Sequence, residues 1–178
     1  MKPHAAAPII ETERLILRGF EPQDFEPYHA MWSEPEVLRY TSGVAKTKRE
    51  SWTMVLRHFA QWQWLGYGYW AVLDKASGKF IGEMGIGDFR RELPFPLTEP
   101  EPGWILTTSN HGKGIGYEAC QAIMAWADAN LALPKTSCLI SPNNLPSMRL
   151  AQKLGFVEVH RFVTNEIPWV IMHRQRQV

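Results

Sequence analysis

The chain has 178 residues and carries 19 Lys and Arg against 18 Asp and Glu, which gives a formal net charge of +1 at pH 7. This length fits one domain with its own core, and the near-neutral balance argues against a basic nucleic-acid-binding or membrane-binding protein. Two cysteines, Cys120 and Cys138, are too few for a disulfide framework and are expected to be reduced core thiols. Eight tryptophans are unusual, because Trp side chains fill either cores or binding surfaces.

The two ends of the chain and its apolar runs set the expected organisation. Residues 1–10 contain one lysine and no long apolar stretch, so we expect a flexible tail rather than a signal peptide, followed by one domain over residues 11–178. The apolar runs are far shorter than a membrane span, and no Cys and His cluster has the spacing of metal ligands. We therefore expect a cytoplasmic protein that binds neither nucleic acid nor membrane nor metal.

The first half of the chain predicts strands and amphipathic helices in alternation. On the long helix, the spacing of Trp52, Val55, Phe59 and Trp62 predicts one buried stripe. The turn residues of 74–79 predict a hairpin between the two strands that flank them. The predicted elements are a strand over 12–20, a helix over about 23–33, a helix over 48–65, and strands over 69–73 and 80–86.

The second half begins with a Pro-rich acidic loop over 90–102. Asn144 is a good helix N-cap, Pro146 suits a first helical turn, and Gly155 suits a left-handed C-terminal cap. The pattern of the whole chain favours a single α/β (α+β) domain with a mixed sheet. The remaining predicted elements are a strand over 103–108, a helix from Gly116 to about 131, a strand over 137–141, a helix over 144–155, and strands over 157–163 and 169–172.

The segment His111–Gly116, with the sequence HGKGIG, lies between a strand and a helix. Its glycines allow positive φ and close approach of the backbone, and the free N–H groups of a helix start attract anions. We expect a phosphate or pyrophosphate there, with Lys113 adding charge. The alternative is a glycine-rich loop that only reverses the chain. The register matches neither a Walker A motif nor a Rossmann fingerprint, which argues against a nucleotide-binding protein.

The segment Ser141–Phe156, SPNNLPSMRLAQKLGF, follows one strand later. Together with the glycine turn it resembles the paired motifs of the GNAT N-acetyltransferase superfamily, which are a Gly-x-Gly turn and then an Asn-x-x-Ser…Gly-Phe helix. The opening TERLILR of residues 12–18 and the Trp-rich early helices are similar to the RimJ/RimL-type branch, which acetylates protein N-terminal amines. The resemblance covers about residues 11–174.

This resemblance implies a mixed, mostly antiparallel sheet that splays open between its fourth and fifth strands, 103–108 and 137–141, flanked by about four helices. Acetyl-CoA would lie in that opening as a co-substrate, with no metal. The implied acetyl-CoA-binding residues are Ile105, Leu106 and Thr107 on the fourth strand, His111, Gly112, Lys113, Gly114, Ile115 and Gly116 in the turn, and Asn144 and Ser147 on the next helix.

The chain departs from the family pattern at two positions. His111 stands where the family usually has Arg or Gln, which we expect to be tolerated because backbone N–H groups hold the ligand. Ala151 stands where many members have a Tyr that acts as general acid, although RimJ/RimL-type sequences often lack this Tyr as well. Ser147 or a water is then the candidate acid for the leaving thiolate.

The implied reaction is direct attack of a neutral primary amine, from a protein N-terminus or a small molecule, on the acetyl thioester. A base must take the amine's proton, and Glu101 and Glu83 are the two candidates. We expect Trp64 and Trp70 to bind the acceptor, and the acidic loop to suit a cationic amine. The alternative is a non-catalytic acyl-CoA-binding or sensing module. Exposed Trp side chains would be consistent with a homodimer.

Overall fold

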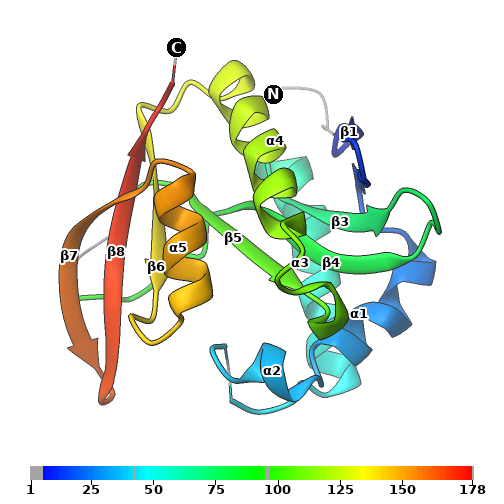
Figure 1. Ribbon diagram of the computed structural model, residues 1–178, viewed down its shortest axis with the longest axis horizontal. Helices are drawn as coiled ribbons and strands as arrows, with labels where there is room; N and C mark the ends of the chain where they lie inside the picture. Colours follow the sequence, from blue (N-terminus) through cyan, green and yellow to red (C-terminus); the bar gives the residue numbers. More distant parts are fainter. Residues whose placement is uncertain (1–5, 42, 95–96, 178) are drawn as a thin grey trace.

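The computed structural model describes residues 6–41, 43–94 and 97–177, whose strands form two antiparallel sheets (Figure 1). The larger sheet has the order β1-β2-β3-β4-β5, and the smaller has the order β6-β8-β7. The strands are β1 (Ile10–Glu11), β2 (Leu15–Arg18), β3 (Tyr69–Asp74), β4 (Phe80–Gly87), β5 (Glu101–Leu106), β6 (Lys135–Ile140), β7 (Val157–Thr164) and β8 (Ile167–Gln175).

Helices cover both sheets. The start of α3 is set by a capping box between Thr47 and Glu50, and its end is set by Gly66 in the left-handed region at φ 75°. Two 3₁₀ turns, Pro22–Asp24 and Thr108–Asn110, complete the helical segments of the described residues. The α-helices are α1 (Phe25–Met31), α2 (Pro35–Leu38), α3 (Lys48–Leu65), α4 (Ile115–Asn130) and α5 (Leu145–Lys153).

The predicted fold class is confirmed, including the break between the strands predicted as the fourth and fifth. These strands are β5 and β6, because the two-residue β1 precedes the strands that the sequence predicted. Pro8, at the end of the predicted tail, accepts a hydrogen bond of 2.8 Å from Nε1 of Trp70, so this end of the tail contacts the domain.

Three tryptophans from separate elements pack together in the core. The ring of Trp62 lies 4.6 Å from that of Trp70 and 5.5 Å from that of Trp126, and each pair is close to perpendicular. The rings of Trp70 and Trp126 are 5.2 Å apart. Aromatic pairs in this edge-to-face arrangement stabilise a core beyond the area that they bury. Part of the Trp excess therefore serves packing between α3, β3 and α4.

The predicted buried stripe of α3 is half wrong. Trp52 is 46% exposed and Phe59 is 61% exposed, whereas Trp62 is buried. The buried face instead includes Ser51 and His58, each of which is at most 1% exposed. Apolar spacing failed here because polar side chains occupy the inward positions and find partners inside the protein.

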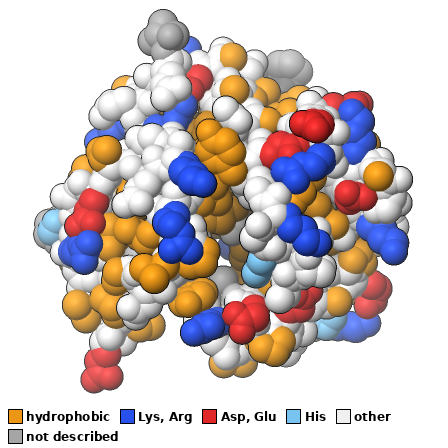
Figure 2. Space-filling model, in the orientation of Figure 1, with side chains coloured by type: hydrophobic (Ala, Val, Ile, Leu, Met, Phe, Trp, Pro, Cys, Tyr) orange, Lys and Arg blue, Asp and Glu red, His pale blue; other side chains and the backbone are white. Residues whose placement is uncertain are grey.

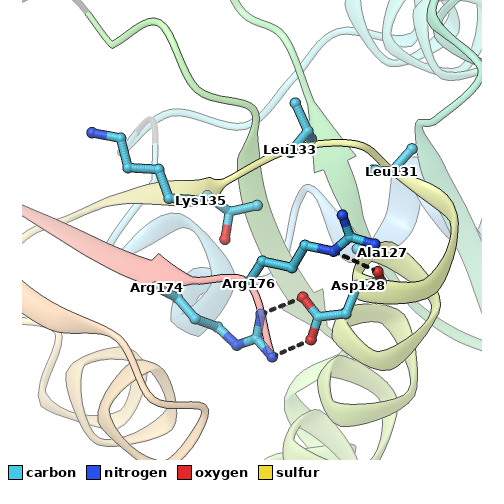
Figure 3. Close-up of a pocket in the computed structure, with 8 residues that line it drawn as sticks. Ala127, Asp128, Leu131, Leu133, Lys135, Arg174 and Arg176 are labelled. Carbon is cyan, nitrogen blue, oxygen red and sulfur yellow. Dashed lines mark hydrogen bonds and ion pairs between the residues drawn. The ribbon is translucent and has the colours of Figure 1, made fainter. Parts of the chain in front are cut away.

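The two sheets touch at one end and separate at the other. At the start of β6, the N–H of Ser137 donates to the carbonyl of Pro100, just before β5, at 3.2 Å. Behind this junction, Arg174 of β8 grips Asp128 of α4 with two hydrogen bonds of 2.9 and 2.6 Å (Figure 3). The cavity beside this pair holds only about 10 Å³, room for one water. The Arg174–Asp128 pair thus helps to hold α4 against the smaller sheet.

Candidate functional site

Where the sheets separate, a cleft runs between them as two joined cavities. One, of about 640 Å³, adjoins the glycine turn and is called the turn cavity. The other, of about 720 Å³, contains Glu83 and is called the Glu83 cavity. Together they have the size of a site for an extended ligand. The residues that line both are Tyr40, Thr41, Trp104, Ile105, Asn144 and Ser147.

The glycine turn leads into α4 with a backbone that only glycine adopts readily. Gly112 and Gly114 have φ values of 72° and 77°, and Gly114 is the N-cap of α4 with no capping side chain. The first N–H groups of α4 therefore have no partner in the helix and lie beside the turn cavity. Arg14 braces the turn from outside by donating to the carbonyl of Lys113 at 2.9 Å. The segment is built to hold an anion.

Most of the predicted acetyl-CoA-binding residues line the cleft, but two do not. Lys113 is exposed and lies outside the lining of both cavities. Thr107 is also outside it, because its N–H donates to Ile81 and its carbonyl accepts from Asn110. The residues that do line the cleft are Ile105, Leu106, His111, Gly112, Gly114, Ile115, Gly116, Asn144 and Ser147.

Cationic side chains stand around the turn cavity. Arg39 lies on the α2 side, and Arg149 and Lys153 lie on α5. In the orientation of Figure 1, Lys and Arg side chains gather on both sides of a hollow between the two halves (Figure 2). The phosphate-binding capacity of this region thus combines uncapped backbone N–H groups with cations that the turn motif itself does not contain.

The start of α5 places polar groups at the junction of the two cavities. Asn144 caps the helix by accepting from the N–H of Ser147 at 3.2 Å. The hydroxyl of Ser147 accepts from Nε1 of Trp104 at 3.1 Å, which leaves its own proton free to be donated. Ala151 is fully buried against the core.

Glu83 projects from β4 into its cavity and is only 2% exposed. Its Oε1 accepts from Nε1 of Trp32 at 3.0 Å and from the hydroxyl of Tyr28 at 3.3 Å. Its Oε2 lies 2.6 Å from Nε2 of His58. Glu83 is opposite Ile105 in the β4–β5 register, so the carboxylate lies beside the strand that lines the cleft.

The sequence singled out Glu83 in this cluster but not His58, and it did not single out Tyr28 or Trp32 either. The ring of His58 stacks between Phe20, at 5.2 Å, and Tyr69, at 4.8 Å. Its Nδ1 is buried without a partner among the described residues. His58 also lines a separate cavity of about 300 Å³ beside Gly19, so its ring stands between that space and the Glu83 cavity.

Glu101, the other predicted base, is 5% exposed and does not line either cavity. Both of its oxygens accept from Nε of Arg91, at 2.9 and 2.8 Å. Burial raises the pKa of Glu101, although Arg91 acts in the opposite direction. The geometry makes Glu101 the group that holds Arg91, whose side chain does line the Glu83 cavity.

The two tryptophans predicted to bind the acceptor do not reach the cleft. Trp70 is fully buried in the Trp cluster of the core, and Trp64 is 87% exposed on α3. Neither lines the Glu83 cavity, where Trp32, Trp104 and Trp169 lie instead. The prediction placed the acceptor site from the position of residues along the chain, and the geometry of the cleft does not support it for these two residues.

The acidic residues of the 90–102 loop also miss the cleft. Glu99 accepts from Nζ of Lys135 at 2.9 Å, and Glu92 is exposed outside the cavity lining. Burial raises the pKa of Cys138 and of Cys120, so both thiols stay protonated. Within the described ranges, no group of three His, Cys, Asp or Glu side chains is arranged to hold a metal, and no helix is long and apolar enough to cross a membrane.

Sequence comparison agrees with this architecture. The family model described as an acetyltransferase (GNAT) domain matches residues 14–157. An uncharacterised Bacillus subtilis protein, YkkB, is 31% identical over 150 residues, 81% of this chain and 82% of its own. An N-acetyltransferase 9-like protein of Caenorhabditis briggsae is 28% identical over 172 residues, 89% of this chain and 85% of its own.

Solved structures share the whole fold. A GNAT-family acetyltransferase from Bordetella pertussis, described as putative, superposes with a TM-score of 0.82 at 27% identity, covering 94% of this chain and 99% of its own. The RimL acetyltransferase of ribosomal protein L7/L12, solved with coenzyme A, has a TM-score of 0.77 at 15% identity, covering 94% of this chain and 98% of its own.

Proposed function

Because the chain belongs to the GNAT acetyltransferase family, we propose that it transfers the acetyl group of acetyl-CoA directly to a primary amine, without a covalent enzyme intermediate. The observation that carries this proposal is the cleft between β5 and β6, which joins an anion-binding turn to a buried carboxylate. Catalysis would come from positioning the two substrates and from charge placed where the reaction needs it.

The residues of the cleft fit acetyl-CoA. The pyrophosphate would bind the N–H groups of Gly112–Gly116, and Arg39, Arg149 and Lys153 lie close enough to the turn cavity to meet phosphate charge. The pantetheine arm would run beside Trp104–Leu106 and the side chain of Asn144, whose amide N–H groups are left free by the cap. Acetyl-CoA supplies the acetyl thioester, and the neutral amine attacks this thioester directly.

Glu83 is the base that we propose. An amine is protonated at neutral pH, so a proton must leave before the nitrogen lone pair can form the new C–N bond. The carboxylate lies in the cavity beside β5 and is held by Trp32 and Tyr28, and it can accept that proton. His58, 2.6 Å from its other oxygen, can take the proton onward toward the cavity beside Gly19.

Ser147 is the acid that we propose for the leaving thiolate. The C–S bond breaks as the C–N bond forms, and the sulfur then needs a proton. Nε1 of Trp104 donates to the hydroxyl oxygen of Ser147, so the O–H of Ser147 is left to donate to another acceptor in the cleft. The missing Tyr at Ala151 therefore does not by itself favour a non-catalytic acyl-CoA sensor.

The acceptor is a primary amine, either the α-amine of a protein N-terminus or a small molecule. The branch resemblance favours the first, and proteins with similar folds are described as acting on acceptors of both kinds. One is a ribosomal-protein-S5-alanine acetyltransferase from Vibrio fischeri, and another is a spermidine N-acetyltransferase from Vibrio cholerae with CoA and spermine. Both share less than 25% identity with this chain, so they support the fold alone.

The test is thiol release from acetyl-CoA by the full chain, with a panel of amines: peptides with N-terminal Ala or Ser, polyamines, aminoglycosides and amino acids. We expect amine-dependent release of CoA and an acetylated product by mass spectrometry. Binding of CoA without turnover of any amine would favour the sensing module. Absence of CoA binding would overturn both functions.

A cytoplasmic location, a lack of nucleic-acid binding and a homodimer stay predictions. The exposed Trp64 on α3 is the aromatic residue that a homodimer would most usefully cover. Sedimentation of the wild-type chain beside a Trp64→Ser variant measures this. An unchanged monomer in both would contradict the homodimer.

A further inference from the structure

The Glu83 cavity has an excess of positive charge in its lining. Four basic side chains face it against two carboxylates, although the whole chain is nearly neutral. A cleft lined by one sign of charge raises the local concentration of ligands of the opposite sign. The basic residues are Lys46, Arg49, Arg57 and Arg91, and the acidic residues are Glu50 and Glu83.

Neither carboxylate neutralises these cations. Glu50 belongs to the capping box of α3, where its Oε2 accepts from the N–H and from the hydroxyl of Thr47, each at 2.8 Å. Glu83 is directed to Trp32, Tyr28 and His58. Arg91 pairs with Glu101 outside the lining, so the unpaired positive charge of the lining belongs to Lys46, Arg49 and Arg57 within the described residues.

Two of the guanidinium groups, those of Arg57 and Arg91, pack against the same aromatic ring. Arg57 lies 5.2 Å from the centre of the Phe89 ring, and Arg91 lies 4.9 Å from it. Glu101 holds Arg91 through Nε alone, which leaves the two terminal NH₂ groups of Arg91 for another acceptor. Arg57 has no carboxylate within ion-pair distance in the part of the chain that the structure describes. This arrangement presents planar donors that match a carboxylate.

The face of α3 that carries Arg57 presents further polar side chains to the Glu83 cavity. Arg49, Thr53 and Arg57 are spaced by four residues on α3, so they stand in one row, and all three line the cavity. The cations expected to meet the phosphates of CoA, Arg39, Arg149 and Lys153, line the other cavity. The chain thus has two cation sets, one at each end of the cleft.

We propose that the acceptor carries a carboxylate near its primary amine, as a free amino acid does, and that Arg57 and Arg91 bind this carboxylate while the amine lies toward Glu83. The inference rests on the proposed function and names its acceptor class. It reverses the expectation of a cationic acceptor, because the acidic loop residues that supported that expectation lie outside the cavity.

The experiment compares kcat/KM for matched acceptors: free amino acids, their α-carboxamides, the corresponding amines without a carboxyl group, and spermidine. Loss of one charge-assisted hydrogen-bond partner lowers kcat/KM by about tenfold or more. We expect the free amino acids to exceed each carboxamide by at least that factor, and spermidine to be the poorest acceptor.

Arg57→Gln should remove most of this preference and leave the affinity for CoA unchanged. The matched control is Lys48→Gln, the same loss of charge on the same helix, at an exposed residue that pairs with Glu26 outside the cavity. Thermal unfolding of both variants reports on their folding.

Equal turnover of acids and carboxamides by the wild type would overturn this inference and leave the proposed function standing. A weaker affinity for CoA in Arg57→Gln, with the preference intact, would also overturn it, by assigning the cation to the phosphates. If CoA binds and no amine is turned over, the proposed function fails and the inference fails with it.

Discussion

The two ends of the cleft are built by different means. The turn cavity owes its anion-binding N–H groups to the backbone of one continuous segment, His111–Gly116, whose conformation depends on glycine, and cations from other segments only add to them. The Glu83 cluster joins side chains from α1, α3 and β4, and Tyr28 and Glu83 are 55 positions apart in the chain. A site made of backbone groups can be recognised from consecutive residues in the sequence, whereas a site made of distant side chains forms only when the chain folds.

This difference also predicts how each end responds to substitution. At the turn, a side chain other than glycine's changes backbone conformation, so the expected loss is in binding. At Glu83, replacing one oxygen removes proton acceptance while the surrounding hydrogen bonds largely remain, so the expected loss is in turnover. The predictions below separate these two kinds of loss.

The largest effect is expected for Glu83→Gln. An amide cannot accept the amine's proton, so kcat/KM for the best acceptor should fall by about 10²–10⁴-fold. The affinity for CoA, measured by calorimetry, should stay within about twofold, because the turn cavity is lined by other residues. The pH dependence of the residual activity should flatten.

The control for this prediction is Glu101→Gln, which changes the other predicted carboxylate and leaves Glu83 in place. It should raise KM for a carboxylate-bearing acceptor, because Arg91 loses its partner, and change kcat only slightly. His58→Gln should fall between the two in kcat. If Glu101→Gln abolishes turnover while Glu83→Gln keeps it, the base has been assigned to the wrong carboxylate.

A smaller effect, on the affinity for CoA rather than on turnover, is expected for Gly114→Ala. Alanine at φ 77° costs about 1–2 kcal/mol, so the turn would relax and the affinity for CoA should fall about tenfold. With saturating acetyl-CoA, kcat should remain near the wild-type value. Calorimetric titration with CoA and steady-state rates over a range of acetyl-CoA concentrations measure both quantities.

Gly66→Ala provides the matched control for the turn. Gly66 has nearly the same φ, 75°, and its added Cβ would meet nothing within 4 Å, but it ends α3 outside the cleft. Both variants should lose similar unfolding free energy, and only Gly114→Ala should lose affinity for CoA. Equal affinities in the two variants would show that the turn does not bind the phosphates.

The features that were predicted correctly from the sequence are those formed by consecutive residues, and the features that were missed depend on contacts between distant segments. The predicted helix over 48–65 coincides with α3, which begins at a capping box of Thr47 and Glu50 and ends at Gly66, and the glycine turn was found because its residues are consecutive. The inward positions of α3 were misjudged, since Ser51 and His58 replace apolar residues there. Sequence spacing carries no signal for such positions, because their partners come from distant segments.

The acceptor end was predicted least well, for a related reason. Trp64 and Trp70 lie in the expected part of the chain, but side chains of a strand alternate between faces, and the β3 register turns Trp70 into the core. Arg57 and Arg91 were not singled out because isolated arginines are common on surfaces. One available signal was the four-residue spacing of Arg49, Thr53 and Arg57, which predicts a polar row on one helix face.

The smallest expected effect concerns Glu99, at the junction where the two sheets touch. Its carboxylate accepts from Lys135 at 2.9 Å and from Ser137 at 3.2 Å, both on β6. Burial alone would raise the pKa of Glu99, but these partners outweigh it and lower the pKa to about 2 from an ordinary 4.5. The ionised form is thus favoured by folding, so its stabilisation is present above pH 4.5 and is lost as the pH falls toward 2.

Glu99→Gln should therefore lower the free energy of unfolding by about 1–2 kcal/mol at pH 7, and the difference from the wild type should shrink as the pH falls from 4.5. Urea unfolding at a series of pH values measures it. Glu158→Gln is the control, since it removes the same charge from an exposed pair with Arg161 on β7 and should change stability little. If the two variants behave alike at every pH, Glu99 does not fasten the sheets, and their contact rests on the backbone bond from Ser137 and on the Asp128–Arg174 pair.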